Sequence, residues 1–206
     1  METNSSAVTL EIFAQAELPT QFGNFRIVAF AHNGSRIEDV ALVRGDVRNG
    51  EDIPARVHSE CVTGDVFHSL RCDCRQQLEA AQKHFSQLPK AILLYMRQEG
   101  RGIGLANKIA AYHLQEQGYD TVDANIHLGF DDDLRTYDIA AAMFKALGVR
   151  SVRLYTNNPR KIEGLESCGI QISARESIII QPNIYNDRYL HTKQEKSGHL
   201  LELKEE

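Results

Sequence analysis

Three of the four cysteines lie within fourteen positions, at Cys61, Cys72 and Cys74. Thiolates gathered from a short, turn-containing segment are ligands that zinc prefers. Three thiolates leave one coordination position for water, which is the arrangement of a catalytic zinc site. Two alternatives stay open: His58 or His68 could close the shell and make the site structural, or the cysteines could be buried as small hydrophobic side chains.

A glycine-rich loop at residues 98–105 joins an expected strand to an expected helix, with glycines at Gly100, Gly102 and Gly104. At such a junction, backbone N–H groups and the helix dipole favour phosphate, and Arg101 adds a guanidinium that can bind it bidentately. The glycine spacing misses the fingerprint of dinucleotide-binding folds by one residue. The loop is a candidate phosphate site, and the alternative is a turn without a ligand.

A second candidate loop spans residues 156–161. It combines Thr156 with two cations, Arg160 and Lys161, which favours an anion site. The competing interpretation is that Asn158, which precedes a proline, is simply a good helix N-cap. A third loop is an acidic run at 131–135, which is typical of a solvated turn or a helix cap.

Helical and extended patterns alternate along the chain without a linker, repeat or low-complexity segment. The first ~55 residues are β-rich, and strands are predicted at 25–30, 40–43, 91–96, 152–155 and 171–180. Helices are predicted at 76–85, 103–117, 138–147 and 159–167, and the tail from 194 is predicted to be helical or frayed. This order predicts an α/β fold: a single layered domain over 1–206 with a mixed β-sheet flanked by helices, and flexible ends at about 1–10 and 200–206.

Composition is that of a soluble globular protein, with 42% hydrophobic and 25% charged residues in a chain of 206. The net charge of −5 argues against a nucleic-acid binder but permits a local pocket for a small anion. No apolar run approaches the ~20 residues that span a bilayer, so no membrane partner is expected. The N-terminus lacks the pattern of a signal peptide. We therefore predict a cytoplasmic protein whose clustered thiols are ligands rather than disulfides.

Several rare strings occur in order along nearly the whole chain. They are Arg56-Val-His-Ser-Glu-Cys61, Arg71-Cys-Asp-Cys74, Arg97-Gln-Glu-Gly-Arg-Gly-Ile-Gly-Leu105, Asn107-Lys108, Asp133-Leu-Arg135 and Thr156-Asn-Asn-Pro159. By these strings the chain resembles the GTP cyclohydrolase II family, which opens riboflavin biosynthesis. The ordered set is far more specific than any one of its members.

The resemblance implies a homodimer, dependent on zinc and magnesium, that acts on GTP and water. The products would be formate, pyrophosphate and a 2,5-diamino-6-ribosylamino-pyrimidinone 5′-phosphate. By the same match Cys61, Cys72 and Cys74 bind one zinc ion per chain, and Mg²⁺ accompanies the triphosphate. The implied GTP contacts are Arg56, Val57, His58, Ser59, Glu60, Gln77, Glu99, Gly100, Arg101, Thr121, Thr156 and Lys161.

The resemblance also implies catalytic roles for three residues. Asp133 matches the family's proton acceptor, Arg135 its proposed nucleophile at the α-phosphorus, and Tyr112 a tyrosine associated with completing deformylation. A guanidinium has a pKa above ~12 and is a poor nucleophile unless it loses a proton. An electrostatic clamp is therefore an equal alternative for Arg135.

Three departures from the family pattern stand out. Arg75 replaces a glycine, so the turn there must differ or place a cation beside the metal. Ser197 replaces a methionine, and Asp132 replaces a small residue. None removes a predicted ligand or catalytic residue, but together they leave room for a divergent paralogue that stops at the formylated pyrimidine.

Two rivals belong to other functional classes. One is a catalytically silent nucleotide-binding regulator on the same scaffold, against which the intact cysteines, Asp133 and Arg135 argue. The other is a protein whose zinc ion only holds a loop. A second domain for butanone-phosphate synthesis is not expected in 206 residues.

Overall fold

The structure, a computed structural model, describes residues 8–178 and 180. Within that range the strands are β1 (Glu11–Thr20), β2 (Gly23–His32), β3 (Ser35–Arg44), β4 (Ile53–Ser59), β5 (Ala91–Met96), β6 (Ser151–Tyr155) and β7 (Gln171–Glu176). The helices are α1 (Val62–Asp65), α2 (Cys74–Ser86), the 3₁₀ helix η1 (Glu99–Gly102), α3 (Leu105–Glu116), α4 (Thr121–His127), α5 (Asp138–Ala146) and α6 (Pro159–Ser167).

These strands form one sheet in the order β1-β2-β3-β5-β4-β6-β7. The pairs β1–β2, β2–β3 and β3–β5 are antiparallel, whereas β5–β4, β4–β6 and β6–β7 are parallel. The sheet is therefore mixed, which confirms the predicted α/β fold class.

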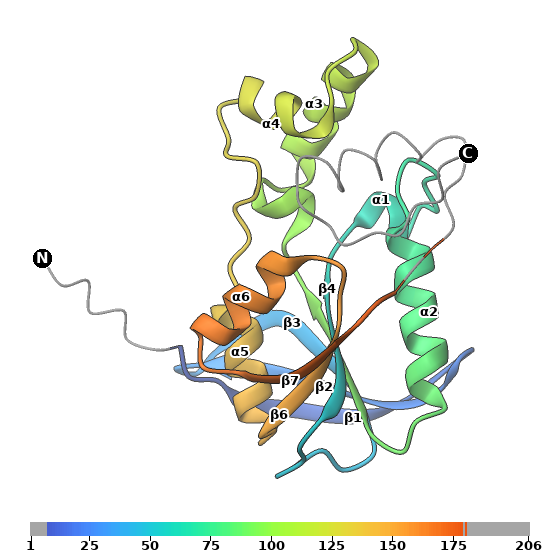
Figure 1. The fold of residues 1–206 in the computed structure, drawn as a ribbon, viewed down its shortest axis with the longest axis vertical. Coiled ribbons are helices and arrows are strands. Elements are labelled where there is room, and N and C mark those ends of the chain that lie inside the picture. The colour runs from blue at the N-terminus through green and yellow to red at the C-terminus, as the bar shows by residue number, and fades with distance from the viewer. Residues whose placement is uncertain (1–7, 179, 181–206) are drawn as a thin grey trace, which may run out of the picture.

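The parallel connections reverse direction at β4. From β4 the chain passes through α2 to β5 on one side, and from β5 it returns through α5 to β6 on the other. Because such crossovers are right-handed, connections that run in opposite directions must cover opposite faces. Figure 1 shows this arrangement, with α2 on one face and α5 and α6 on the other. The carboxyl ends of β4, β5 and β6 thus meet at a topological switch point, where open α/β sheets bind ligands.

Two apolar clusters cover the two faces of the sheet. In β5, Ile92 and Leu94 lie in the larger cluster with Phe144 of α5, whereas Leu93 lies in the smaller cluster with Phe85 of α2. Each of these side chains is at most 1% exposed. Burial of one such side chain contributes roughly 1.5–3 kcal/mol, so the two clusters hold β5 and its neighbours firmly.

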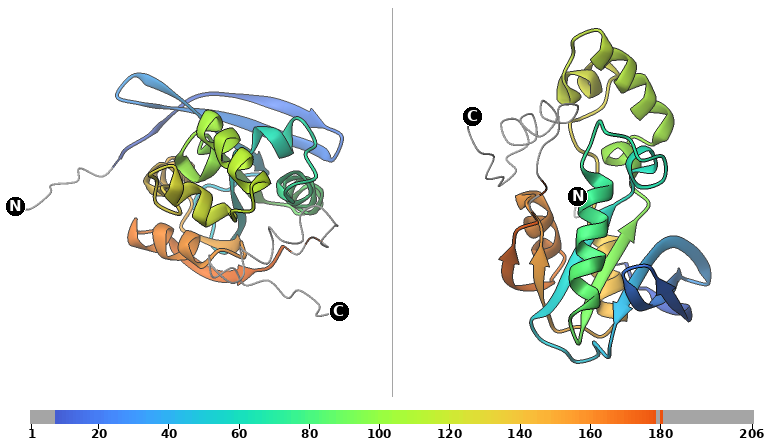
Figure 2. Two further views of the ribbon diagram at one scale, coloured as in Figure 1. Left: turned by 90° about the horizontal axis from the view of Figure 1, so that it is seen from above. Right: turned by 90° about the vertical axis from the view of Figure 1, so that its right-hand side faces the viewer.

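A lobe made of α3 and α4 stands beyond the carboxyl ends of the strands, as Figure 1 and the right-hand view of Figure 2 both show. The lobe interrupts the crossover between β5 and α5. None of the helices in residues 8–178 and 180 is long and apolar enough to cross a membrane.

The predicted elements overlap the observed ones, although most boundaries shift by one or two residues and β3 begins at Ser35 rather than at 40. Helix α3 begins at Leu105 rather than at 103, because Gly104 has a φ of 84° and acts as the N-cap. Strand β7 ends at Glu176 rather than at 180, and beyond its end the side-chain amide of Asn157 donates to the carbonyl oxygen of Ile178 at 2.6 Å. The short helices α1 and α4 and the strands β1 and β4 were not predicted individually.

The ends of the chain were predicted to be flexible. Residues 1–7, the tail from 194 and the end at 200–206 lie outside the described residues. Within the predicted N-terminal end, Leu10 is 7% exposed and belongs to the larger apolar cluster, against which Val8 also packs.

Candidate active site

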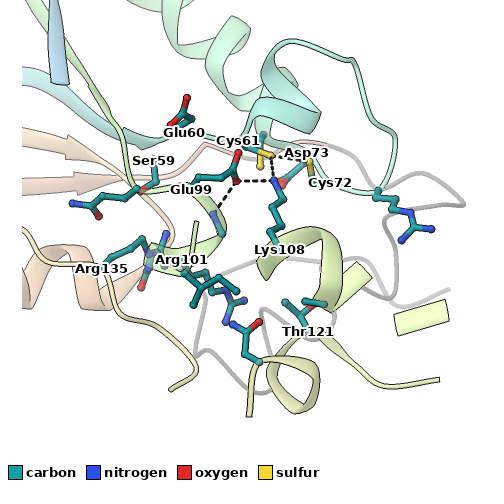
Figure 3. A pocket seen from close by; sticks show the side chains of 18 of the residues that line it. Ser59, Glu60, Cys61, Cys72, Asp73, Glu99, Arg101, Lys108, Thr121 and Arg135 are labelled. Carbon is teal, nitrogen blue, oxygen red and sulfur yellow. Dashed lines mark hydrogen bonds and ion pairs between the residues drawn. The ribbon is translucent and has the colours of Figure 1, made fainter. Parts of the chain in front are cut away.

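A cavity of about 350 Å³ opens where β4, β5 and β6 end. That volume is in the range of small-molecule sites, ~300–1,000 Å³. Sixteen of the residues predicted from the sequence line it: Arg56, His58, Ser59, Glu60, Cys61, Cys72, Cys74, Gln77, Glu99, Gly100, Arg101, Tyr112, Thr121, Arg135, Thr156 and Lys161. Figure 3 shows the sulfur atoms on one wall, with Arg101 and Arg135 together on another.

Two predicted site residues do not line the cavity. The side chain of Val57 is packed in the larger apolar cluster, and its carbonyl oxygen accepts a hydrogen bond of 2.6 Å from Lys161 Nζ. The side chain of Asp133 is 7% exposed and binds the guanidinium of Arg135. Each of them thus supports a residue that does face the cavity.

The three predicted metal ligands form one cluster. The Sγ atoms of Cys61, Cys72 and Cys74 all lie within 4.8 Å of one another, and those of Cys61 and Cys72 are 3.6 Å apart. Tetrahedral ligands at the usual zinc–sulfur distance of about 2.3 Å stand about 3.8 Å apart. Gly64 of α1 closes the cradle, because a Cβ there would lie 2.8 Å from Cys72 Sγ. The donor set and its spacing therefore suit a soft divalent ion.

Negative charge in this cluster concentrates on Cys61. Hydrogen bonds from the thiols of Cys72 and Cys74 hold the pKa of Cys61 well below its usual value, despite burial. Hydrogen bonding to Cys61 raises the pKa of Cys72 to about 11 and also raises the pKa of Cys74. A metal ion would displace the remaining thiol protons, because the thiolate is the form that binds metal.

The two histidines that could have closed the metal shell have other partners. His58 Nε2 lies 3.1 Å from Asp65 Oδ2, and burial lowers the pKa of His58. His68 Nε2 lies 2.6 Å from Arg75 Nη1. Among the described residues, the cluster that could hold an ion contains the three cysteines and neither histidine. This favours the open site over the closed structural one.

Asp65 fixes the turn that carries Cys61. Its carboxylate accepts hydrogen bonds from the backbone N–H of Cys61 at 3.1 Å and from Tyr95 Oη at 2.9 Å. Burial and the charge of Asp65 raise the pKa of Tyr95, so the phenol remains a donor. The first cysteine is thereby held by its backbone as well as by its packing.

The loop after β5 forms another wall of the cavity. Gly100 and Arg101 have φ values of 64° and 61°, in the left-handed region that glycine adopts most readily. The carboxylate of Glu99 accepts hydrogen bonds from the backbone of Val62 at 2.6 Å and of Gly100 at 2.8 Å, and it binds Lys108 Nζ at 2.7 Å. Glu99, a predicted GTP contact, therefore also ties α1 and α3 together.

Arg135 and Asp133 form a bidentate ion pair. Arg135 Nε donates to Asp133 Oδ1 at 2.8 Å, and Nη2 donates to Oδ2. Burial would raise the pKa of Asp133, but the hydrogen bonds and charge of Arg135 outweigh it and lower that pKa. Asp133 is consequently ionised and Arg135 protonated near neutral pH.

Three buried polar atoms of residues at the cavity have no hydrogen-bond partner within the described residues, namely Arg56 Nε, Ser59 Oγ and Gln98 Oε1. The other guanidinium nitrogens of Arg56 donate to Gln77 Oε1 and to the carbonyl oxygen of Tyr155 at 3.2 Å. Burial lowers the pKa of Arg56 to about 10. Because an unsatisfied buried donor costs ~1–3 kcal/mol, these atoms indicate where a polar ligand would complete the site.

Tyr112 connects the lobe to the sulfur cluster. Its Oη lies 3.2 Å from Thr63 Oγ1, which in turn lies 3.6 Å from Cys61 Sγ. Burial raises the pKa of Tyr112, so a neutral phenol stands beside the candidate metal site.

The loop after β6 places Thr156 and Lys161 at the cavity. Asn158 caps α6, since its Oδ1 accepts a hydrogen bond of 3.0 Å from the backbone of Arg160. The backbone N–H of Asn158 donates to Thr156 Oγ1 at 3.1 Å. The capping and anion-binding interpretations of this loop are therefore compatible.

Residues 11–177 match the family model described as GTP cyclohydrolase II, which is more than half of the chain. The chain belongs to the GTP cyclohydrolase II family. A GTP cyclohydrolase-2 from Cronobacter sakazakii is 54% identical over 192 residues, which cover 93% of this chain and 98% of that relative. A GTP cyclohydrolase-2 from Histophilus somni is 50% identical, covering 93% and 89% respectively.

A longer relative and a solved structure are also similar. The riboflavin biosynthesis protein RibBA of Endomicrobium trichonymphae is 52% identical over 185 residues, which are 90% of this chain and 46% of RibBA. The chain thus spans about half the length of that relative. The crystal structure of RibBX, a two-domain 3,4-dihydroxy-2-butanone 4-phosphate synthase from A. baumannii, aligns with 87% of this chain and 42% of its own, at a TM-score of 0.47 and 20% identity.

Arg75 is the departure nearest to the cysteines of this GTP cyclohydrolase II family member. It lies in the first turn of α2, where its Nε pairs with Glu79 Oε1 at 2.7 Å and its Nη1 donates to the carbonyl oxygen of Asp65 at 3.1 Å. The guanidinium does not line the cavity. The sequence predicted that Arg75 would either change the turn or place a cation beside the metal. Instead, Arg75 is a helical residue whose guanidinium points to α1 and to Glu79.

Asp132 joins the loop at 131–135 to its neighbours. Its Oδ2 lies 2.8 Å from Arg160 Nη1, and its carbonyl oxygen accepts a hydrogen bond of 3.2 Å from Arg101 Nη1. The third departure, Ser197, lies outside the described residues.

Sequence reasoning gave no role to Asp73 or Lys108, which both line this cavity. Asp73 stands between two of the cysteines, is 2% exposed and accepts a hydrogen bond from Gln77 Nε2. Lys108 points from α3 to Glu99 and Cys61, as Figure 3 shows. The signal for Lys108 was its place in the rare string Asn107-Lys108.

Proposed function

We propose that this protein is a GTP cyclohydrolase II that converts GTP and water into formate, pyrophosphate and a 2,5-diamino-6-ribosylamino-4(3H)-pyrimidinone 5′-phosphate, the first step of riboflavin biosynthesis. The observation that carries the proposal is that one cavity contains three clustered thiols together with the guanidinium groups of Arg101 and Arg135. Opening a purine ring by hydrolysis calls for a Lewis acid, and releasing pyrophosphate calls for cations. Relatives named GTP cyclohydrolase-2 match over most of this chain.

Cys61, Cys72 and Cys74 would hold one zinc ion. When bound, zinc supplies the Lewis acidity for hydrolysing first the imidazole ring and then the formyl group. Mg²⁺ would arrive with the triphosphate, since this ion is commonly bound through substrate phosphates rather than by a protein cage.

The triphosphate would lie against Arg101, Thr156 and Lys161, at the two loops predicted to bind anions. A charge-assisted hydrogen bond from Arg101 would be worth ~1.5–3 kcal/mol. The unsatisfied Arg56 Nε and Ser59 Oγ would bind further polar atoms of the nucleotide.

Arg135 would act as an electrostatic clamp on the α-phosphate. Its bidentate pairing with an ionised Asp133 stabilises the protonated guanidinium, and a protonated guanidinium has no free lone pair for attack. Developing negative charge on the departing pyrophosphate is what such a cation stabilises. A covalent phosphoryl-arginine found after rapid quenching would contradict this role.

Tyr112 would assist deformylation. Its phenol is linked through Thr63 to Cys61, so it lies on the metal side of the cavity. We further propose that the protein acts as a homodimer in the cytoplasm, where reducing conditions keep ligand thiols free, and uses neither nucleic acid nor a membrane. Light scattering at several concentrations tests the dimer.

The function is tested by incubating the zinc-loaded protein with GTP and Mg²⁺ and assaying formate, pyrophosphate and the pyrimidine separately. All three products are expected in equal amounts. Pyrophosphate without formate would indicate the divergent paralogue that stops at the formylated pyrimidine. GTP binding without any product would indicate the regulator.

Matched variants separate the two halves of the reaction. Cys61→Ser should lose metal and formate but retain slow pyrophosphate release, whereas Arg135→Ala should lose pyrophosphate release. Cys168→Ser is the control, because Cys168 follows the end of α6 and does not line the cavity. If Cys61→Ser loses pyrophosphate release as fully as Arg135→Ala does, the proposed division between metal and cations is wrong.

A further inference from the structure

Lys108 is a cation enclosed between a carboxylate and a metal-ligand sulfur. Its Nζ lies 2.7 Å from Glu99 Oε1 and 3.1 Å from Cys61 Sγ. The Lys108 and Glu99 side chains are 11% and 8% exposed, respectively. Figure 3 shows the lysine reaching from α3 to both partners. A lysine is rarely buried without a partner, and here two partners fix one ammonium group.

The surroundings hold this ammonium in one place. Glu99 cannot turn away easily, because the backbone N–H groups of Val62 and Gly100 also donate to its carboxylate. Gly100 lets the lysine stem pass closely, since a Cβ there would lie 3.1 Å from Lys108 Cβ. The lysine is therefore aimed at the sulfur by the scaffold.

The net charge of a three-thiolate metal site suggests what the contact between Lys108 and Cys61 does. Three thiolates around a divalent ion carry a net charge of −1, which makes the ion a weaker Lewis acid than it is among neutral ligands. An N–H···S hydrogen bond from a fixed cation draws electron density from the sulfur and restrains its direction. Partners outside the ligand shell commonly tune metal sites in this way.

We propose that Lys108 is a positioning residue for the metal centre, which orients Cys61 and offsets the surplus negative charge of a three-thiolate site. This inference rests on the proposed function for the presence of the metal, and extends it to a residue that the family motifs did not assign. Glu99 serves in it as the anchor of Lys108.

The test compares Lys108→Met, which keeps the length but removes the charge and donors, with Lys108→Arg, which restores both. Lys83→Met is the matched control, because Lys83 is exposed on α2 and does not line the cavity. Each protein is loaded with Co²⁺, and the sulfur-to-cobalt charge-transfer band is recorded. Zinc affinity is measured by competition with a chelator, and circular dichroism verifies the fold.

In Lys108→Met the band should move to lower energy, because loss of the hydrogen bond raises the energy of the sulfur electrons. Zinc affinity should fall by about 10–100-fold, as is typical when an outer partner of a metal ligand is removed. Lys108→Arg should restore most of both properties, and Lys83→Met should match the parent.

Lys108→Met with an unmoved band and a zinc affinity within twofold of the parent would overturn the inference. A parent protein that takes up neither Zn²⁺ nor Co²⁺ would overturn both the inference and the proposed metal site. A parent that binds metal but yields no product from GTP would refute the proposed function only. The position of the charge-transfer band in Lys108→Met would still test the role of Lys108.

Discussion

The substitution Gly64→Ala should weaken zinc binding while it leaves the protein folded. A Cβ at this position would lie 2.8 Å from Cys72 Sγ and 3.2 Å from Cys61 Sγ. Non-bonded carbon contacts are favourable near ~3.5–4.0 Å, so Gly64→Ala must push the Cys72 sulfur away by about 0.7 Å. Metal–ligand distances tolerate only about 0.2 Å. The substitution should therefore displace a ligand beyond the range in which it can bind.

The same change should leave the fold intact. Gly64 lies within α1 and has no left-handed φ, so alanine gains about 1 kcal/mol in helix propensity. Overpacking costs roughly 1–3 kcal/mol, which leaves a net loss of about 0–2 kcal/mol against a typical stability of ~5–15 kcal/mol. Gly64→Ala should thus fold while its zinc affinity falls by at least about tenfold.

The assay is zinc content per chain and affinity by chelator competition, with urea unfolding measured in parallel. Gly50→Ala is the control, because a Cβ there would crowd the Ile53 side chain at 2.6 Å, outside the cavity. That variant should lose comparable stability and keep its metal. A Gly64→Ala protein with zinc affinity within threefold of the parent would refute the view that these sulfurs form a tightly packed ligand set.

Three further outcomes are expected. Arg101→Ala should lower kcat/KM for GTP by about 10–150-fold, the equivalent of ~1.5–3 kcal/mol of charge-assisted hydrogen bonding, and a change under twofold would mean that the triphosphate lies elsewhere. Tyr112→Phe should reduce formate release by at least about 100-fold while pyrophosphate release stays within threefold, as product assays will show. Burial lowers the pKa of His58 despite Asp65, so proton uptake by the unfolded chain should reduce stability as the pH falls below ~6.5. In urea titrations with EDTA between about pH 7 and pH 5, His58→Gln should show a shallower decline than the parent, and equal slopes would contradict this assignment.

Some strands were easier to predict from the sequence than others. Strand β5 is buried on both faces, so its apolar run was evident. Strand β4 carries the buried polar side chains Arg56 and His58, and these site residues conceal its apolar pattern. Strand β1 is mostly exposed and lacks a regular alternation that would fix its bounds. Function and exposure, rather than weak propensity, hid these two strands.

The site was predictable as a set of residues but not as a set of contacts. The family resemblance that the rare strings carry named sixteen of the cavity residues before any geometry was known. No string could indicate that the carboxylate of Glu99 accepts hydrogen bonds from Val62 and Lys108. Nor could a string indicate that Arg75 pairs with Glu79. Such choices depend on side-chain direction and on neighbours distant in the sequence. Lysine is also usually exposed, so its residue type alone does not indicate that Lys108 contacts Glu99 and Cys61.

The lobe made of α3 and α4 contributes Tyr112 and Thr121 to the cavity, whereas the three cysteines of that cavity lie between the end of β4 and the start of α2. Two of its apolar side chains, Ile109 and Ile126, are 49% and 59% exposed, so these two side chains add little to the burial that holds the lobe closed. Segments of this kind open locally at lower free energy than the core around β5. A nucleotide that touches both sides would raise that opening free energy in proportion to the logarithm of its concentration over Kd. Slowed amide hydrogen exchange in α3 and α4 would therefore report occupancy of the cavity without any turnover.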